Sequence, residues 1–453
     1  MIIGVKMGKT VMIIGSGGRS HAISEAYERS SLVDNILLLP GNDLCSYKRK
    51  KDVICIKNIE LTDFNSIVEV AKKYKVDLID ITRSEPLSKG ISDILRENGL
   101  NVFGPSKFAV RIESDKVFAR NFMKKWNIPS PKFDVFSDEM MAIEYVRGIY
   151  RYDSDKKLFI KASGLCDGKG VFLVENFEQA VIAIKKMKQF GHAGEVFLVE
   201  DGIDGEEISI SVISDGKNYH ILKTAHNDKH TRNYDQGPIS RGVGSNSPVL
   251  SLYNDDILEE IEQKIIRKSI LGLNHEKTPF VGILTAVLMI TNEQGKMVPK
   301  VIEFNARYGN PEAQVILPGI KTDYYDIVDH VLKGKLDKID IVEDSLYRFC
   351  VVGCSRGYPG NVSHVKGKMI HGIKEVFDLD GVSLYGSNLY YSNDRFYVAG
   401  GRLFHIVGAS SDLLDAKTKA YCAISRIYVE GNNLQYRTDI AWKDVEIEYM
   451  RRI

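Results

Sequence analysis

The sequence predicts a multidomain protein of mixed α/β and α+β class, on three observations. The chain has 453 residues, more than one ordinary hydrophobic core can serve, so two to four domains are expected. Strand and helix patterns alternate over residues 10–105, which is typical of a parallel sheet covered by helices. The last part of the chain is rich in strand patterns and glycine, with one helix expected at 413–429.

The N-terminal alternation begins with an apolar strand and a helix. Strands are expected at 10–15, 35–41, 76–82 and 100–106, and helices at 19–30, 64–76 and 90–99. The first turn reads GSGG and resembles the Rossmann fingerprint, although Ser20 stands where its last glycine belongs. Because the first N–H groups of such a helix are unpaired and carry partial positive charge, this turn could hold a single phosphate. The alternative is a tight turn without a ligand.

A helix at 114–126 opens the middle region, and a small α+β unit follows it. This unit contains KASGLCDGKGVF, residues 161–172, between short apolar runs that are typical of strands. A Walker P-loop needs four residues between its first glycine and the Gly-Lys pair, and then a helix. Only three residues separate Gly164 from Gly168, so the segment is predicted to be a strand–loop–strand hairpin.

The hairpin loop can still bind phosphate. Glycines let backbone N–H groups approach an anion closely, and lysine adds a positive charge. The alternative is a flexible surface turn. The candidate residues are Lys161, Gly164, Gly168, Lys169 and Gly170.

The region after the hairpin ends in a strand with a metal-binding pattern. Strands are expected at 207–214, 220–225, 282–291 and 300–305, with a long polar loop and a helix at 258–270 between them. Glu303 and Asn305 are two residues apart on the last strand, so both face the same way, and their oxygens suit Mg²⁺. Arg307 would share this face if the strand continued, and could grip a carboxylate or phosphate. A solvated strand edge is the alternative.

Composition narrows the possible functions. Lys plus Arg is 61 and Asp plus Glu is 60, so the net charge of +1 gives no reason to expect nucleic acid or membrane partners. No apolar run approaches the length of a transmembrane helix. The six cysteines include no C-x-x-C pair, which favours a reduced, cytoplasmic setting. Cys350 and Cys354 are expected to pack in a buried strand.

Segments over nearly the whole chain resemble the ATP-grasp superfamily, and more closely its phosphoribosylamine–glycine ligase family. A short stretch before Met7 lies outside the resemblance. Because the motifs keep their order over four regions, the resemblance is far more specific than any one of them. They are IGSGGRSHA, LPGN, NVFGPSKFAV, SDKVFARNFM, IKASGLCDGKGV, DGEE, EFNARYGNPE, GYPG, AGGRLFHIVG and YRTDIAW.

The resemblance implies three domains. These are an N-terminal Rossmann-like domain at 1–110, a two-lobed ATP-grasp domain at 111–345 with a lid at 131–199, and a C-terminal strand-rich domain at 346–453. The hairpin loop would be a mobile part of the lid. Cys166 stands in this loop where the family tends to have a small residue, so oxidation there could affect activity, although packing is the simpler role.

The resemblance also implies a nucleotide site between the two lobes. Lys116 and Lys161 would contact phosphates, Glu200 and the backbone after it the adenine, and Glu207 the ribose. Mg²⁺, with Mn²⁺ as a substitute, would be held by the Glu303–Asn305 pair.

The implied reaction joins glycine to 5-phosphoribosylamine in purine biosynthesis. Glycine attacks the γ-phosphorus of ATP to give glycyl phosphate, and the amine of 5-phosphoribosylamine then displaces phosphate. Positioning and charge neutralisation dominate such chemistry, so no Ser or Cys nucleophile is expected. Arg307, with Lys161, is the catalytic candidate and would hold the glycine carboxylate or its acyl phosphate. Asp235 would hold the glycine ammonium, and Gly17 and Gly18 the sugar phosphate. A monomer or weak homo-oligomer is expected.

The chain departs from the family pattern mainly on the acceptor side. Ser20 and Ser84 each replace an acid, and Glu85 could supply the second acid after a shift of one residue. Ile239 replaces an amide and Asn310 an aspartate. Two alternatives therefore stay open: an ATP-grasp ligase with another acceptor, and a nucleotide-binding protein without catalysis.

Overall fold

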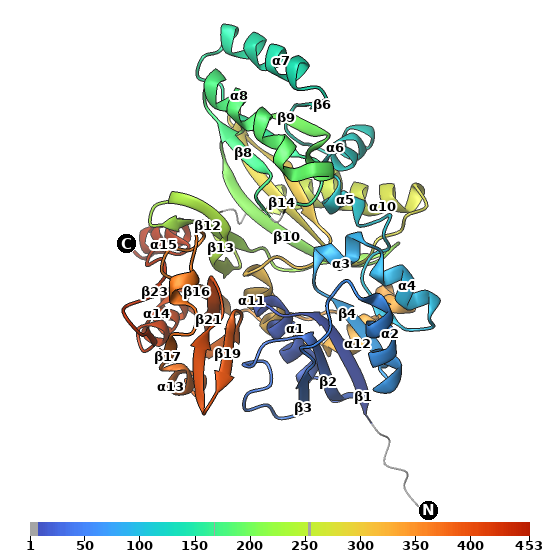
Figure 1. The fold of residues 1–453 in the computed structure, drawn as a ribbon, viewed down its shortest axis with the longest axis vertical. Helices are drawn as coiled ribbons and strands as arrows, with labels where there is room; N and C mark the ends of the chain where they lie inside the picture. Colours follow the sequence, from blue (N-terminus) through green and yellow to red (C-terminus); the bar gives the residue numbers. More distant parts are fainter. Residues whose placement is uncertain (1–7, 167, 252–254) are drawn as a thin grey trace, which may run out of the picture.

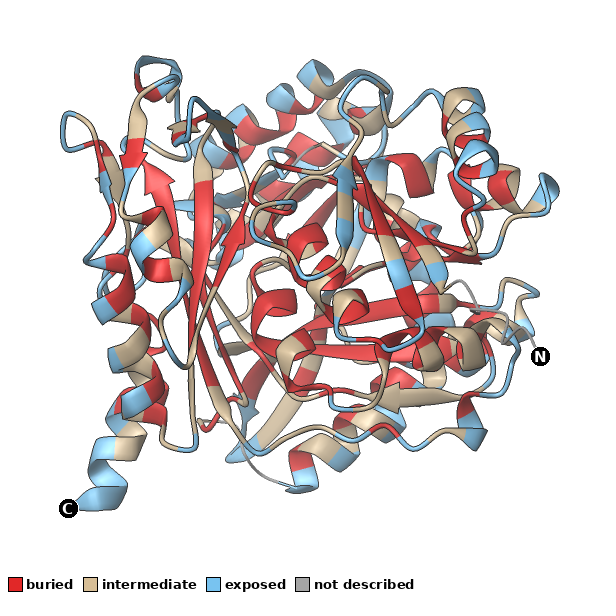
Figure 2. Ribbon diagram, turned by 90° about the horizontal axis from the view of Figure 1, so that it is seen from below, coloured by how far each residue is buried: buried red, intermediate tan, exposed pale blue. Residues whose placement is uncertain are grey.

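The structure is a computed structural model that describes residues 8–166, 168–251 and 255–453. The stretch before Met7 that lies outside the family resemblance is not among the described residues. Figure 1 shows an upper lobe that stands on two larger lower bodies, one N-terminal and one C-terminal. Figure 2 shows buried residues running along the strands of the sheets, which form the cores of these bodies.

The N-terminal region forms the predicted parallel sheet, in the order β3-β2-β1-β4-β5. Val11 and Ile13 of the central strand enter one core cluster, whereas Met12 and Ile14 enter another, because both faces are covered. β3 and α3 were not predicted. The strands are β1 (Lys9–Gly15), β2 (Val33–Pro40), β3 (Asp52–Cys55), β4 (Leu78–Ile81) and β5 (Val102–Phe103), and the helices α1 (Gly18–Glu28), α2 (Phe64–Lys73), α3 (Ser84–Ser88) and α4 (Ile91–Glu97).

The upper lobe in Figure 1 is a four-stranded sheet with its own apolar core. Its strands lie in the order β6-β9-β7-β8, with β7 and β8 antiparallel, so the predicted strand–loop–strand hairpin is confirmed. Asp138 and Asn176 cap its two helices by accepting backbone N–H bonds. The elements are β6 (Phe133–Phe136), α7 (Glu139–Tyr152), β7 (Leu158–Ala162), β8 (Val171–Val174), α8 (Phe177–Lys186), a 3₁₀ segment (Met187–Gly194) and β9 (Phe197–Asp201).

A second sheet, in the order β11-β10-β14-β15, lies below this lobe. Helices α5, α6, α9 and α10 accompany it, and the last two are joined by a π-helical turn, Glu262–Ile266. The predicted helix at 258–270 is therefore part of one longer helical segment. The elements are α5 (Arg111–Ser114), α6 (Lys116–Lys125), β10 (Glu206–Asp215), β11 (Tyr219–Ile221), α9 (Asp255–Ile261), α10 (Arg267–His275), β14 (Val281–Glu293) and β15 (Lys296–Asn305).

The prediction of a long polar loop after residue 225 is wrong. The segment is instead a β hairpin, β12 (His226–Arg232) and β13 (Gln236–Ser247). β13 pairs with β16 of the C-terminal region, from Gly244 opposite Val351 to Ser247 opposite Arg348. The partner strand lies about a hundred residues away in the sequence, so the local polar pattern gave no sign of the pairing.

The C-terminal region is rich in strands, as predicted, and the helix expected at 413–429 is confirmed as α14. It is not the single helix of this region, because α13 and α15 also form there. Cys350 and Cys354 are buried in β16, which confirms the expected strand. The elements are β16 (Tyr347–Ser355), β17 (Met369–His371), α13 (Ile373–Phe377), β18 (Val382–Gly386), β19 (Leu389–Ser392), β20 (Arg395–Val398), β21 (Arg402–Ser410), α14 (Leu413–Ile424), β22 (Tyr428–Val429), β23 (Leu434–Gln435) and α15 (Trp442–Arg452).

Two helices connect the second sheet to the C-terminal region: α11 (Glu312–Ile316) and α12 (Tyr324–Leu332). α12 packs in the core against the N-terminal sheet, where its Tyr324 ring meets the Tyr27 ring edge-on at 5.0 Å. Among the described residues, no helix combines the length and the apolar character needed to cross a membrane.

Asp80 of β4 is a buried carboxyl group in this interface. The Tyr27 hydroxyl donates to Asp80 Oδ2 at 2.9 Å. Burial raises the pKa of Asp80 to about 7, although Tyr27 and Arg19 oppose the shift. The folded protein therefore holds this proton more tightly than the unfolded chain, and its contribution makes the fold less stable as the pH rises from about 4 to about 7.

We expect Asp80→Asn to remove this dependence on pH. Asparagine is neutral at every pH and can still accept from Tyr27. The variant therefore avoids the loss in free energy of unfolding, ~1.4 kcal/mol for each pH unit, that Asp80 causes between its unfolded and folded pKa values. Its advantage in unfolding temperature over the parent protein should grow from pH 5 to pH 7 and level off above. Thermal unfolding followed by circular dichroism measures this, and a constant difference from pH 5 to pH 8 would contradict the assignment.

Candidate active site

The upper lobe, residues 133–201, is called the lid from here on, and one face of its sheet carries a buried ion cluster. Ile160 and Val199 enter the lid core, so their neighbours Lys161 and Glu200 point to the opposite face. Lys161 Nζ lies 2.5 Å from Glu200 Oε1. Arg120 Nε of α6 donates to Glu200 Oε2 at 2.7 Å. One carboxylate therefore serves two cations.

Arg120 joins the lid to the second sheet. Its Nη2 donates to the backbone carbonyl of Ile302 at 2.7 Å, and its Nη1 donates to that of Val301 at 3.3 Å. Both carbonyls belong to β15. The lid and the strand with the predicted metal ligands thus meet at a buried arginine.

Burial and the neighbouring charges together set the pKa values of Glu200 and Lys161. Burial acts to raise the pKa of Glu200, but Lys161 and Arg120 outweigh it and hold that pKa below its usual value. Burial lowers the pKa of Lys161, with Arg120 acting in the same direction and Glu200 against it. Glu200 is therefore ionised, and the cluster keeps excess positive charge.

The second sheet turns its polar face toward the lid. Ile208 and Phe304 enter the core on one side, so Glu207, Glu303 and Asn305 lie on the other. The predicted common face of Glu303 and Asn305 is confirmed, because the irregularity in the β14–β15 pairing falls before Glu303. β15 ends at Asn305, so Arg307 follows the strand and does not extend it.

Glu303 is exposed within the cleft and lies among cations. The protein around it acts to raise its pKa by desolvation, but Lys229, Lys116, Lys161 and Arg307 outweigh this and hold the pKa of Glu303 below its usual value. The structure thus brings the lid lysine and three further cations around a residue of the predicted metal pair.

Lys229 of β12 is a site residue that the sequence analysis missed. Its Nζ lies 2.6 Å from Glu207 Oε1. Burial acts to lower the pKa of Lys229, but Glu207, Glu303 and Glu312 raise it above its usual value. The signal in the sequence is the lysine inside the polar run HNDKH, residues 226–230.

Glu303 and Asn305 fit a hard divalent cation. Across the part of the chain that the structure describes, neither side chain has a hydrogen-bond or ion-pair partner, so a carboxylate oxygen and an amide oxygen remain available on one face. Carboxylate and amide oxygens are the ligands that Mg²⁺ takes in proteins, together with water and phosphate oxygens.

The glycine-rich loop approaches the cleft, and two of its glycines, Gly164 and Gly168, stand where another residue would clash or be strained. The Gly164 N–H donates to Ala193 O at 2.9 Å, and a Cβ on Gly164 would lie 2.7 Å from the Ala193 Cβ. Gly168 has φ +74°, and a Cβ there would lie 3.6 Å from Arg241 Nε of β13. The backbone of the loop therefore lies against the β12–β13 hairpin across the cleft.

The rest of the loop is held by local bonds. The Lys169 N–H donates to Cys166 O at 2.9 Å, and the Gly170 carbonyl accepts from the Ala162 N–H at 2.8 Å. The Cys166 thiol donates to Gly164 O at 3.5 Å.

Lys116 lies at the start of α6, where the helix is fastened to the lid. The Lys116 N–H donates to Ser163 O at 2.9 Å. The Ser163 hydroxyl donates to Asp115 Oδ1 at 3.0 Å, and Asp115 also caps α6. This junction brings Lys116 close to the end of the strand that carries Lys161.

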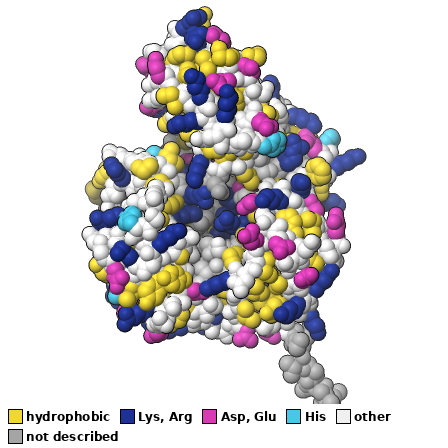
Figure 3. Space-filling view, in the orientation of Figure 1, with side chains coloured by type: hydrophobic (Ala, Val, Ile, Leu, Met, Phe, Trp, Pro, Cys, Tyr) yellow, Lys and Arg dark blue, Asp and Glu magenta, His cyan; other side chains and the backbone are white. Residues whose placement is uncertain are grey.

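Arginines gather at the N-terminal side of the cleft. Burial, together with Arg307, Arg83 and Arg402, lowers the pKa of Arg19, and Glu113 opposes them. Figure 3 shows Lys and Arg side chains around the hollow at the centre of the molecule. Such a surface attracts anionic ligands.

Gly17 and Gly18 begin α1 on this side. The first N–H groups of a helix have no partner within it, so they can serve an anion. A Cβ on Gly18 would lie 2.4 Å from His405 Nδ1. His405 is fully buried, which lowers its pKa to about 3, so the imidazole is neutral.

Asp235 and Glu85 are not brought into this constellation. Asp235 Oδ1 accepts from Arg437 Nη1 at 2.9 Å, and Asp235 Oδ2 accepts from Trp442 Nε1 at 3.3 Å. Glu85 pairs with Lys89 on the surface at 2.8 Å. The idea that Glu85 supplies the missing acid after a shift of one residue is therefore wrong, because its side chain is directed along α3.

The other departures from the family pattern are accommodated within the protein. The Ser20 hydroxyl lies 2.8 Å from Thr82 Oγ1 in the interior. Asn310 Oδ1 accepts from Gln314 Nε2 at 2.6 Å. Ile239 is exposed on β13.

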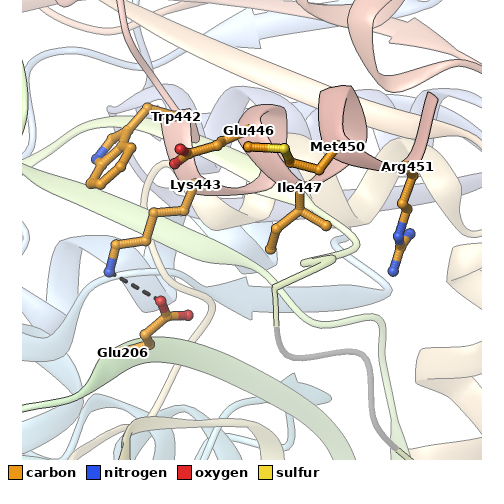
Figure 4. Close-up of a pocket in the computed structure, with 7 residues that line it drawn as sticks. All are labelled: Glu206, Trp442, Lys443, Glu446, Ile447, Met450 and Arg451. Atoms are coloured by element: carbon orange, nitrogen blue, oxygen red, sulfur yellow. Dashed lines mark ion pairs between the residues drawn. The ribbon is translucent and has the colours of Figure 1, made fainter. Parts of the chain in front are cut away.

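A groove of about 630 Å³ lies elsewhere, between α15 and the start of β10. Figure 4 shows Trp442, Lys443 and Met450 along one wall, with Lys443 paired to Glu206 at 3.2 Å. None of the predicted site residues lines it, so we place the chemistry in the cleft below the lid.

Family models match most of the chain. They are described as phosphoribosylglycinamide synthetase, with an N domain at residues 9–113, an ATP-grasp (A) domain at 114–313 and a C domain at 348–443.

Named relatives agree with this match. A phosphoribosylamine–glycine ligase of Caldanaerobacter subterraneus is 35% identical over 434 residues, which are 95% of this chain and 99% of that protein. A bifunctional purine biosynthetic protein of Dictyostelium discoideum is 33% identical over 96% of this chain, and the match spans 54% of its own length.

Solved structures share the fold. The crystal structure of phosphoribosylamine–glycine ligase from Thermotoga maritima has a TM-score of 0.79 and 27% identity, and covers 95% of this chain and 100% of that one. A biotin carboxylase from Campylobacter jejuni has a TM-score of 0.70 at 14% identity, over 98% of this chain and 96% of that one, which shows the ATP-grasp fold alone. With its parallel N-terminal sheet, its lid over a polar sheet and its strand-rich C-terminal region, this chain belongs to the phosphoribosylglycinamide synthetase family.

Proposed function

We propose that this protein joins glycine to 5-phosphoribosylamine at the expense of ATP, giving glycinamide ribonucleotide, ADP and phosphate. It is an ATP-dependent ligase of purine biosynthesis, as its family membership implies. The observation that carries the proposal is the convergence of Lys116, Lys161, Lys229 and Arg307 on Glu303 in one cleft.

The nucleotide lies between the lid and the polar face of the second sheet. Lys116 and Lys161 contact its phosphates, and the loop with Gly164, Gly168, Lys169 and Gly170 closes over them and excludes water. The Glu200 carboxylate is already bound to Lys161 and Arg120, so its role is to orient Lys161. The backbone after Glu200 is then the part that contacts the adenine.

The ribose side of the nucleotide falls near Glu207. Its Oε1 is paired with Lys229, so a ribose hydroxyl would meet its other oxygen. Lys229 then lies between this side and Glu303, where its charge can neutralise phosphate oxygens.

Glu303 and Asn305 are the residues that hold the divalent cation. A cation bound there would neutralise charge on the phosphates. We propose Mg²⁺ as this cation, because the two ligands leave room for water and phosphate oxygens.

Arg307 holds the glycine carboxylate and then its acyl phosphate. The carboxylate attacks the γ-phosphorus, ADP leaves, and the amine of the acceptor attacks the acyl carbon with loss of phosphate. The protein contributes orientation and positive charge, and no side chain forms a covalent bond.

The acceptor phosphate is assigned to the N-terminal side of the cleft, at Gly17, Gly18 and Arg19. The Asp235 carboxylate is engaged by Arg437 and Trp442, so the proposal gives it no substrate. We further propose a monomer or weak homo-oligomer in the cytoplasm.

The test is an assay with ATP, Mg²⁺ and glycine, with and without freshly made 5-phosphoribosylamine. Phosphate release and product mass are followed together. Release that depends on the amine, with the mass of glycinamide ribonucleotide, supports the proposal. Turnover only with other amines would favour a ligase with another acceptor, which the departures at Ser84 and Ile239 suggest. ATP binding without turnover would favour a binding protein.

A further inference from the structure

The Glu113 carboxylate ties three separate segments together beside the cleft. Its Oε1 accepts from the Ser84 hydroxyl at 2.7 Å and lies 3.1 Å from Arg307 Nη2. Its Oε2 accepts from the backbone N–H of Ala306 at 2.9 Å. Glu113 belongs to α5, Ser84 to α3, and Ala306 and Arg307 to the segment after β15. Both oxygens are thus used, and the side chain is only 7% exposed.

These bonds fix the direction of the Arg307 guanidinium. Besides the pair with Glu113, Arg307 Nε donates to the Ser84 hydroxyl at 3.2 Å, and Nη1 donates to the carbonyl of Tyr308 at 3.2 Å. The guanidinium is 20% exposed, so part of it still faces the cleft. Each of its three nitrogens is therefore oriented by a named acceptor.

The charge around Arg307 makes this carboxylate necessary. Arg83, Arg307 and Arg402 all act on Arg19, and Glu113 is the carboxylate that opposes them. Without it, these four arginines would repel one another and Arg307 Nη2 would lose its acceptor. A fixed arginine fork binds a carboxylate more specifically than a mobile one, because less entropy is lost on binding.

We infer that Glu113 is a positioning residue: it holds the Arg307 guanidinium in the direction needed for the carboxylate of glycine and the acyl phosphate, with the Ser84 hydroxyl as a bridge. This inference depends on the proposed role of Arg307. It also bears on Ser84, which stands where the family has an acid. A serine cannot neutralise an arginine, so Glu113 is the carboxylate that pairs with Arg307.

The decisive experiment is a double-variant cycle with Glu113→Gln and Arg307→Met. Glu113→Gln keeps the size of the side chain and removes its charge, so the KM for glycine should rise roughly 10- to 100-fold. ATP binding without glycine, measured by calorimetry, should change less than about twofold, because the described bonds of Glu113 go to Ser84, Ala306 and Arg307 and not to the Lys161–Glu200 cluster. In a protein that already carries Arg307→Met, adding Glu113→Gln should lower kcat/KM by less than about threefold. The reason is that Arg307, the partner of Glu113, is already lost.

Glu85→Gln is the matched control, since Glu85 lies next to Ser84 but pairs with Lys89 on the surface. Its KM for glycine should equal that of the parent protein. Ser84→Ala should raise the KM for glycine less than Glu113→Gln does, because only the bridge is removed.

Two results would overturn the inference. One is a parent-like KM for glycine in Glu113→Gln. The other is full additivity of the two changes, with ATP affinity and unfolding temperature falling together, which would mean that Glu113 only supports the fold. If the parent protein itself makes no glycinamide ribonucleotide, the proposed function fails, and this outcome is distinct from both.

Discussion

Glu303→Gln is expected to lower kcat by about 10³-fold or more without unfolding the protein, because it removes the one anionic ligand of the proposed metal pair. Glu303 is exposed in the cleft and makes no ion pair with another described residue, so its loss breaks no structural contact. The four cations around it keep the carboxylate ionised. The amide has nearly the same shape, so the effect comes from the charge.

The variant should also need more metal. A titration of activity with MgCl₂ and with MnCl₂ should show the half-saturating concentration shifted upward at least roughly tenfold for both ions. The unfolding temperature without nucleotide should stay within about 2 °C of the parent protein, because surface-type substitutions change stability little.

Glu293→Gln serves as the control for Glu303→Gln. Glu293 lies at the far end of β14, half exposed, where it pairs with Lys300. It shares the sheet with Glu303 but not the cleft, so its kcat should equal that of the parent protein. Near-normal turnover in Glu303→Gln would remove the metal site from the proposal.

The elements whose information is local were predictable. The strand–loop–strand hairpin followed from apolar runs on both sides of the glycines, and the shared face of Glu303 and Asn305 followed from the two-residue period of a strand. The parallel N-terminal sheet followed from the alternation of strands and helices. The structure confirms each of these.

The features that depend on distant partners were not predictable. β13 pairs with β16 across about a hundred residues, and its polar pattern looks like a loop until that pairing is known. Arg120 and Glu113 look like ordinary helix residues in the sequence, but each neutralises a partner far along the chain. Asp235 carried the right charge for an ammonium, yet Arg437, about two hundred residues later, is bound to it.

The cleft as a whole has a consistent electrostatic character. Lys116, Lys161, Lys229 and Arg307 surround Glu303 on the proposed nucleotide side, and Arg19 and Arg83 lie on the proposed acceptor side. Buried cations without partners are costly, so the positive excess is stable only because solvent reaches the cleft and anions can enter it. The proposed arrangement, with one phosphorylated substrate on each side of glycine, matches this distribution of charge.

The Lys161–Glu200–Arg120 cluster gives the largest expected effect on stability. Glu200→Gln should destabilise the closed contact between the lid and the second sheet by about 3–5 kcal/mol, because two buried cations lose their shared anion. Glu200 is 1% exposed, and Arg120 is 4% exposed, so water cannot replace the carboxylate without opening the lid. The rate of lid cleavage in native-state proteolysis measures this opening.

The order of effects within the cluster is the sharper test. Lys161→Met should destabilise the lid less than Glu200→Gln does, since Glu200 keeps its bonds to Arg120. The double variant should be more stable than Glu200→Gln alone, because the remaining cation, Arg120, still donates to the carbonyls of Val301 and Ile302. Glu195→Gln, an exposed change in the same segment, should leave cleavage unchanged. If Lys161→Met were the most damaging of the three, the cluster would carry no excess positive charge, and it would not be a cationic site for nucleotide phosphates.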